Sequence, residues 1–295
     1  MYFRKLSLIV LMALCTLCPV SAKNALVVIA HGSPMPGWNA PVLVLENQLR
    51  DELRRQGITR YDYVRVALME FTTPTIADVI DDCEREGIDR IYALPLFIAP
   101  SSHSEQDIPN IIGHKYDAHV LADLREEGTR LVDTKIPIVL GPTLSADSLL
   151  SEVMTARITE MSKDKSVEGI VLLAHGDANY VGFWKRLLGR IGRDVEQNTG
   201  IPYLSGTFVG MGQQFKSDVM DVIEKAAAQK KRLLVQGVYL ATGVDVMARM
   251  SGVTAETDKM TANEVVFGSL GILPASSEAV CRWIIEKAME CDKIK

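Results

Sequence analysis

The sequence lacks several patterns that would assign it to a common functional class. No Gly-Lys dipeptide occurs in its 295 residues, so it has no P-loop and no nucleotide cofactor is expected. No G-x-S-x-G segment is present, which argues against a serine hydrolase, although Ser33, Ser101 and Ser102 lie close to histidines. No long basic block appears and the net charge is -5, so nucleic-acid binding is not expected.

Cysteine is also scarce, and two of the five cysteines, Cys15 and Cys18, lie in an apolar N-terminal stretch. The other three, Cys83, Cys281 and Cys291, form no C-x-x-C pair, which excludes a zinc ribbon and a thioredoxin-like motif. Cys281 and Cys291 fall on one predicted helix, about 15 Å apart along its axis, too far for a disulfide. We therefore expect buried structural thiols, at least one of them unpaired.

Long apolar runs are absent except at the N-terminus, where residues 1–22 resemble a signal peptide. A positive start at Arg4 and Lys5 precedes an apolar stretch that ends at Cys18, and small residues up to Ala22 supply a cleavage site. An uncleaved membrane anchor is the alternative, but this stretch is shorter than the about 20 residues that a span needs. We expect an exported, periplasmic protein that keeps no membrane span after cleavage.

Beyond the leader, strand and helix patterns alternate. Continuous apolar runs of strand length, separated by amphipathic helices, are typical of a parallel sheet covered on both faces. Before the pattern repeats, the sequence predicts strands at residues 25–30, 63–68, 90–99 and 136–140, with helices at 41–56, 75–86 and 146–162. This pattern predicts an α/β fold with flavodoxin-type layering.

The pattern then repeats, which indicates an internal duplication. The matching segments are Ala-His-Gly at His31 and at His175, residues 63–70 and 203–210, and residues 96–99 and 238–241, at offsets of 144, 140 and 142 positions. We therefore predict two similar domains, at residues 23–143 and 144–295, of which the second is a degenerate copy. A cleft between such domains is a usual place for a ligand.

Three polar residues of the first half fall where parallel sheets bind ligands, beyond the carboxyl ends of the strands. His31 follows the first strand, Glu70 the second and His103 the third. Two imidazoles and a carboxylate on one rim suit Co²⁺, Fe²⁺, Ni²⁺ or Zn²⁺ with open coordination positions. The alternative is that His31 caps a helix and Glu70 is merely solvated.

The second half provides an internal comparison for this metal site. His175 matches His31, but Gly210 stands where Glu70 does and Asp245 where His103 does. Residues with a purely structural role would be expected to decay similarly in both halves. Because the three potential ligands are complete in the first half and incomplete in the second, the sequence predicts a single metal site, in the first domain.

Three segments around these residues resemble a known family. They are Val-Val-Ile-Ala-His31-Gly-Ser33, Met69-Glu70, and the stretch from Leu94 to Pro109 that contains His103 and Asp107. Together they resemble the class II tetrapyrrole chelatases of the CbiX and CbiK type, over nearly all of the chain after the leader. The chain departs from the family at Ser101 and Ser102, where members often have glycines.

The resemblance implies ATP-independent insertion of a divalent metal, Co²⁺ first and Fe²⁺ or Ni²⁺ as alternatives, into sirohydrochlorin or a related tetrapyrrole. It implies that His31, Glu70 and His103 hold the metal and that His31 and His103 are catalytic. A histidine of ordinary pKa, about 6.5, can both bind a metal and accept a pyrrole proton. The residues assigned to contact with the tetrapyrrole are Ser33, Ser101, Ser102 and His175.

Other side chains are weaker candidates for contact with the macrocycle. Met35, Trp38, Phe71 and Met211 could cover its face, and Arg125, Lys185, Arg186 and Arg249 could meet its carboxylates. Ordinary packing and ordinary surface charge are the alternatives for these residues. The same cleft also fits a different class: an exported tetrapyrrole- or metal-binding protein without turnover, such as a scavenger or carrier of haem, cobalt or nickel. Self-association into a homo-oligomer is compatible with either function.

Overall fold

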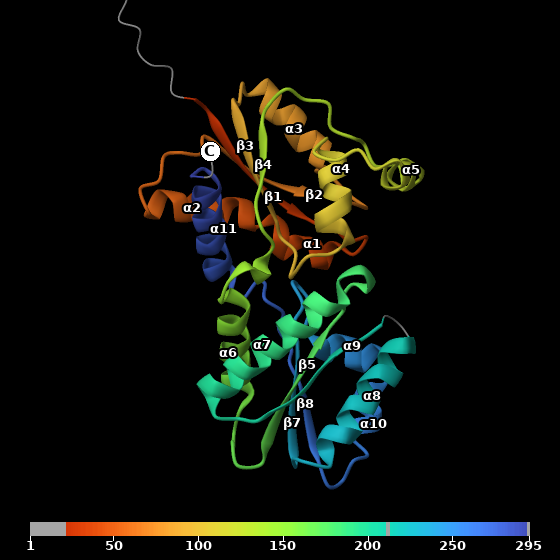
Figure 1. Ribbon diagram of the computed structural model, residues 1–295. Helices are drawn as coiled ribbons and strands as arrows, with labels where there is room; N and C mark the ends of the chain where they lie inside the picture. The colour runs from red at the N-terminus through yellow and green to blue at the C-terminus, as the bar shows by residue number, and fades with distance from the viewer. Residues whose placement is uncertain (1–21, 211–212, 294–295) are drawn as a thin grey trace, which may run out of the picture.

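Two four-stranded parallel sheets organise the chain in a computed structural model that describes residues 22–210 and 213–293 (Figure 1). The first sheet has the order β2-β1-β3-β4 and the second the order β6-β5-β7-β8. The strands are β1 (Asn24–Ala30), β2 (Tyr63–Leu68), β3 (Arg90–Pro95), β4 (Ile138–Leu140), β5 (Glu168–Ala174), β6 (Tyr203–Phe208), β7 (Arg232–Gly237) and β8 (Glu264–Phe267). The predicted α/β fold with two similar parallel-sheet domains is confirmed.

Backbone hydrogen bonds relate the two sheets residue by residue. The equivalent donor-acceptor pairs are Met69 to Ala30 and Val209 to Ala174, then Leu96 to Ile29 and Val238 to Leu173. Glu70 and Gly210 therefore occupy the same place in the two domains, as do Phe97 and Tyr239. The expected signal peptide lies outside the described residues, apart from Ala22. No helix among the described residues is both long and apolar enough to cross a membrane.

Helices cover both faces of each sheet because the side chains of the central strands alternate between two apolar layers. In β1, Leu26 and Val28 belong to one core cluster, whereas Val27 and Ile29 belong to another. The helices are α1 (Pro36–Leu43), α2 (Leu45–Arg55), α3 (Ile76–Arg85), α4 (Ile108–Ile111), α5 (Ala118–Glu126), α6 (Leu149–Met161), α7 (Val181–Thr199), α8 (Gln213–Ala227), α9 (Val244–Met250), α10 (Val253–Thr257) and α11 (Ser277–Cys291). Local signals set several boundaries, since Thr75 and Asp78 form a capping box at the start of α3 and Gly200 ends α7 in the left-handed conformation.

Two predicted elements differ from the structure by more than a few residues. The helix predicted at residues 41–56 is two helices, and the first begins at Pro36, because proline is well suited to the first position of a helix. The strand predicted at residues 90–99 ends at Pro95. The apolar residues that follow it form a loop, which carries Phe97 toward the cleft between the domains.

The helix that follows the fourth strand of each sheet packs on the other domain. Helix α6 follows β4 of the first sheet but contacts α7 and β7, and α11 follows β8 but contacts α2 and β3. At the end of α11, Asp292 accepts a hydrogen bond from Tyr92 and forms an ion pair with Arg60. The sequence predicts residues 144–295 as the second domain, whereas α11, which lies in that range, covers the first sheet. One apolar cluster consequently runs through both domains.

Candidate functional site

Three loops at the carboxyl ends of β1, β2 and β3 bring His31, Glu70 and His103 together. His31 Nε2 lies 3.9 Å from Glu70 Oε2, and the ring centroids of His31 and His103 are 4.7 Å apart. One potential ligand atom from each residue lies within 4.8 Å of the others. Two ligands of one ion are about 3–3.5 Å apart, so small side-chain rotations would close this group around a divalent metal.

Both imidazoles are held by their Nδ1 atoms. His31 Nδ1 is 2.8 Å from the carbonyl oxygen of Gly32, which can only accept, so the imidazole donates there. His103 begins a π-helical turn, η1 (His103–Asp107), and its Nδ1 lies 2.7 Å from the Asp107 carboxylate. Each contact fixes the tautomer that leaves Nε2 free as a ligand, which is the usual arrangement of metal-binding histidines.

The backbone conformation of Gly32 allows Glu70 to lie beside His31. The Glu70 amide donates to the carbonyl oxygen of His31 at 2.9 Å, which places the two loops in contact. Gly32 has a φ of +91°, and a Cβ atom there would clash with the carbonyl oxygen of Glu70. Only glycine meets both conditions without strain. The Ala-His-Gly motif therefore has a structural reason as well as a chemical one.

The electrostatic surroundings favour a proton on His103. The hydrogen bond to Asp107 raises the pKa of His103 above its ordinary value, and the Coulombic effects of Asp107, Glu70 and Asp177 act in the same direction against burial. A more basic imidazole is a stronger proton acceptor, provided that it is neutral when the proton arrives. His103 is thus suited to general-base chemistry as well as to metal binding.

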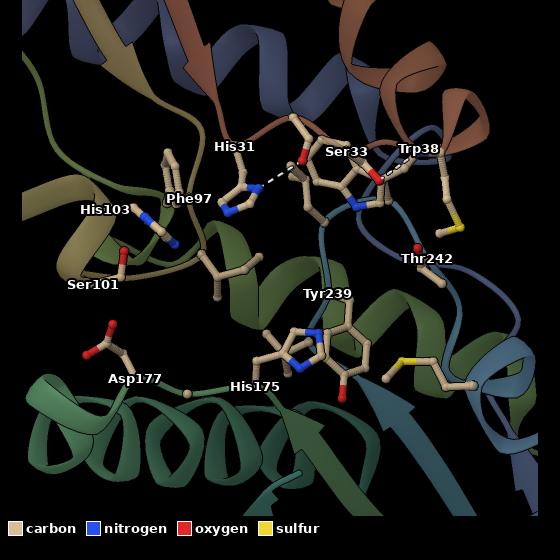
Figure 2. A pocket seen from close by; sticks show the side chains of 18 of the residues that line it. His31, Ser33, Trp38, Phe97, Ser101, His103, His175, Asp177, Tyr239 and Thr242 are labelled. Atoms are coloured by element: carbon tan, nitrogen blue, oxygen red, sulfur yellow. Dashed lines mark hydrogen bonds between the residues drawn. The ribbon is translucent and has the colours of Figure 1, made fainter. Parts of the chain in front are cut away.

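A cavity of about 1200 Å³ opens between the two domains, and the imidazoles of His31 and His103 form part of its wall (Figure 2). This is larger than the usual 300–1,000 Å³ of small-molecule pockets. Figure 2 shows His31 and His103 reaching the cavity from the first domain, opposite His175 and Asp177 of the second. Glu70 is not among the lining residues, and its side chain is 18% exposed, against 33% for His31.

The walls of the cavity are largely apolar. Met35, Trp38 and Phe71 line it as the sequence suggested, and Met211 lies outside the described residues. Met35 and Phe71 are 62% and 63% exposed, which is unusual for large apolar side chains and marks the mouth of the cavity as a contact surface. A broad apolar ligand could therefore be covered on its faces while one edge meets the imidazoles.

The polar residues assigned to the tetrapyrrole are divided by the structure. Ser33, Ser101 and His175 line the cavity, but Ser102 does not. The backbone N–H and the hydroxyl of Ser102 both donate to Asp177, at 2.9 and 3.2 Å. Sequence reasoning missed Asp177, whose only signal was its position two residues after His175.

The four basic residues considered as candidates for contact with the substrate do not line the cavity. None of Arg125, Lys185, Arg186 and Arg249 is among the lining residues, and Arg249 is instead paired with Asp245 at 2.7 Å. Lys216 does line the cavity, next to Glu256 at 3.1 Å. The sequence around Lys216 has no pattern that identifies it as a residue of the cavity. The start of α8 comes close to the cleft only because of how that helix packs.

The second domain keeps the scaffold of the site without its ligands. His175 follows β5, its ring centroid lies 4.6 Å from that of Tyr239, and burial lowers its pKa. In the part of the chain that the structure describes, the one group of three potential metal ligands is His31, Glu70 and His103. The three cysteines of the described residues are free, and Cys83 and Cys281 are buried.

Comparisons with known proteins identify proteins that are similar to this chain. The CbiX family model matches residues 25–161. A sirohydrochlorin cobaltochelatase from Methanococcus maripaludis is 37% identical over 90 residues, which are 30% of this chain and 58% of that protein. Another from Methanococcoides burtonii is 30% identical over 144 residues, which are 48% of this chain and 99% of that protein.

Solved structures extend the similarity in fold to both domains. The sirohydrochlorin chelatase SirB from Bacillus subtilis subspecies spizizenii, in complex with cobalt, superimposes with a TM-score of 0.63 at 16% identity. That match covers 92% of this chain and 98% of the SirB chain. The family model ends at the last residue of α6, whereas the structural match covers most of the second domain as well.

Proposed function

This chain belongs to the CbiX family, and we propose that it inserts a divalent metal ion into sirohydrochlorin or a related tetrapyrrole without a nucleotide. The observation that carries the proposal is the meeting of His31, Glu70 and His103 at the wall of a broad apolar cavity. Co²⁺ is the metal that we propose first, because the relatives are named cobaltochelatases and two imidazoles with a carboxylate suit such an ion.

The three ligands suit an ion that has to leave again. In our proposal, the ion is held by His31 Nε2, by His103 Nε2 and by the less exposed Glu70 carboxylate, and water completes its coordination. The side of the ion that faces the cavity is then open to the pyrrole nitrogens. In this arrangement Glu70 binds the ion on the side away from the cavity, and the two imidazoles release the ion to the pyrrole nitrogens.

Insertion exchanges one divalent cation for two pyrrole protons, so the site has to accept protons while it releases the metal. As the ion moves to the pyrrole nitrogens, the Nε2 atoms become free bases. We propose that His103 takes one proton, because Asp107 stabilises the resulting imidazolium. His31 takes the second or passes it to solvent.

The cleft supplies a place for the macrocycle. We propose that the ring is covered by Met35, Trp38 and Phe71 and that Ser33, Ser101 and His175 contact its polar edge. Lys216 is the basic side chain at the cavity that could meet a carboxylate of the substrate. Together these contacts would hold one pyrrole edge against His31 and His103.

Absorbance of the purified protein mixed with Co²⁺ and sirohydrochlorin, in the absence of ATP, tests the proposal. We expect several equivalents of cobalt product per protein, in excess of the uncatalysed rate. A spectral change that stops at one equivalent would instead identify a binding or carrier protein. Parallel reactions with Fe²⁺ and Ni²⁺ rank the metals.

We also propose that the protein is exported to the periplasm after cleavage behind Ala22. The support is the basic, apolar and small-residue sequence of residues 1–22. Fractionation of cells that express the full chain should place it in the periplasm with Lys23 as its first residue. Replacement of Arg4 and Lys5 by glutamate should retain it inside the cell, and recovery of an uncleaved native chain there would contradict the proposal.

A further inference from the structure

The loop that carries His103 is held from the second domain. Asp177 Oδ2 accepts hydrogen bonds from the Ser102 backbone N–H and hydroxyl, at 2.9 and 3.2 Å. The Asn179 side-chain amide donates to the same hydroxyl at 2.9 Å, and the Trp184 indole donates to the carbonyl oxygen of Pro100 at 3.0 Å. Four hydrogen bonds thus tie the two residues on either side of Ser101 to the degenerate half.

Asp177 can make this contact because it replaces a serine of the first copy. Ser33 lies two residues after His31, and its hydroxyl accepts from the Met35 backbone N–H at 3.1 Å. Asp177 lies two residues after His175, and its Oδ1 accepts from the Asn179 backbone N–H at 2.8 Å. The turn is the same, but a carboxylate has a second oxygen, and that oxygen reaches across the cleft.

The position of Ser102 matters because it immediately precedes His103 at the start of η1. A carboxylate that accepts from the N–H at the beginning of a helical turn stabilises that turn and orients it. Both Asp177 oxygens accept hydrogen bonds, Oδ2 from Ser102 and Oδ1 from its own turn at Asn179. The contact across the cleft therefore fixes the residue that immediately precedes His103.

We propose that Asp177 is a positioning residue for metal insertion: by holding Ser102 it sets His103 beside Glu70. The inference rests on the proposed function, since it assumes that His103 is a metal ligand. The degenerate half thereby keeps a role in the metal site of the other half. Because the metal site is then held by a contact across the cleft, its affinity for the ion also depends on how the two domains are arranged.

The test is Co²⁺ binding, without tetrapyrrole, to the full mature chain carrying Asp177→Ser. Serine keeps the local turn, as Ser33 does, but cannot span to Ser102. We expect Co²⁺ affinity to fall about 10- to 100-fold, the range seen for residues that orient metal ligands. The visible spectrum of bound Co²⁺ should shift toward that of His103→Ala, because the ion loses the imidazole of His103. A general destabilisation of the fold would not remove that one ligand specifically.

Asp221→Ser is the matched control, because Asp221 is an exposed aspartate of the same domain whose side chain is 68% exposed. It should bind Co²⁺ like the unmodified chain. Asn179→Ala removes only the amide bond to Ser102 and should weaken binding in the same direction by a smaller factor, which keeps the test valid if Asp177→Ser folds poorly. Control-like affinity in both variants would overturn the inference and leave the proposed function intact. Equal Co²⁺ binding by the unmodified chain and His103→Ala would overturn both.

Discussion

His103 Nδ1 donates a hydrogen bond of 2.7 Å to the carboxylate of Asp107, four residues later on the same helical turn. The sequence placed these two residues in one motif, and the structure gives the pair a chemical meaning. Asp107 orients the imidazole and raises its pKa, so that one carboxylate affects both metal binding and proton acceptance.

Asp107→Asn should weaken Co²⁺ binding about 10- to 100-fold near neutral pH and lower the pH below which the affinity begins to fall. The metal requires a neutral imidazole. Because Asp107 raises the pKa of His103, the Co²⁺ affinity of the unmodified protein should begin to fall on acidification at a higher pH than that of an ordinary histidine site, and loss of that carboxylate moves this pH down. Dissociation constants for Co²⁺ determined at each pH from 5 to 8 measure this. Asp123→Asn, on the exposed surface of α5, is the control, and an unchanged pH dependence of the affinity in Asp107→Asn would count against the role of Asp107.

His103→Ala should abolish metal insertion, whereas His175→Ala should leave most of the rate constant intact. His103 belongs to the group of three potential ligands, while His175 faces the cavity beside Tyr239. Initial rates at saturating Co²⁺ and varied tetrapyrrole separate the two roles, and the remaining effect of His175→Ala should appear in KM. Equal loss of kcat in both variants would contradict the assignment of a single site to the first domain.

Gly32→Ala should destabilise the fold and weaken metal binding together. Alanine at a φ of +91° is strained, and its Cβ would push on the carbonyl oxygen of Glu70. Gly57→Ala is the control, since Gly57 has a φ of +66° but open space where a Cβ would lie. Chemical denaturation should give a loss of about 1 kcal/mol for Gly57→Ala and a larger loss for Gly32→Ala. Only the second should change Co²⁺ affinity.

Glu168→Gln should cost about 3–5 kcal/mol of unfolding free energy, because it removes the buried one of the two carboxylates that pair with the buried guanidinium of Arg232. Glu264→Gln, which removes the exposed partner of Arg232, should cost less than about 1 kcal/mol. Denaturant titrations compare the two variants. Similar losses would show that burial does not decide the strength of these pairs.

The same carboxylate predicts how stability depends on pH. Burial by itself raises the pKa of Glu168, but hydrogen bonds from Ser162, from the backbone of Lys163 and Asp164, and from Arg232 lower it below its ordinary value of 4.5. A folded-state pKa below the unfolded one adds stability above the unfolded value, and this stability is lost as the pH falls through the folded value. The acid limb of the stability curve should therefore be shallower in Glu168→Gln.

Much of the fold was predictable because its signals are local. Strands buried on both faces read as continuous apolar runs, which is why the predicted 63–68 coincides with β2 and 25–30 lies within β1. The Ala-His-Gly repeat revealed the duplication, since the same turn leaves each central strand. Candidate ligands followed from topology, because the ends of parallel strands share one edge of the sheet.

Other features depended on packing between distant segments. Helix α11 reads as an ordinary amphipathic helix of the second half, and only its contacts with α2 and β3 place it on the first sheet. The four basic residues suggested for the cleft were chosen for their charge, but none of them lines the cavity, whereas Lys216 does.

The sequence by itself determined the alternation of strands and helices, the duplication, and which residue follows each strand, because these depend on local periodicity and on spacing along the chain. The tertiary structure decided which side chains meet across the cleft. Asp177 contacts Ser102 over 75 positions of sequence, and no local pattern encodes such a contact. It forms because two domains that share one apolar core bring the two loops face to face.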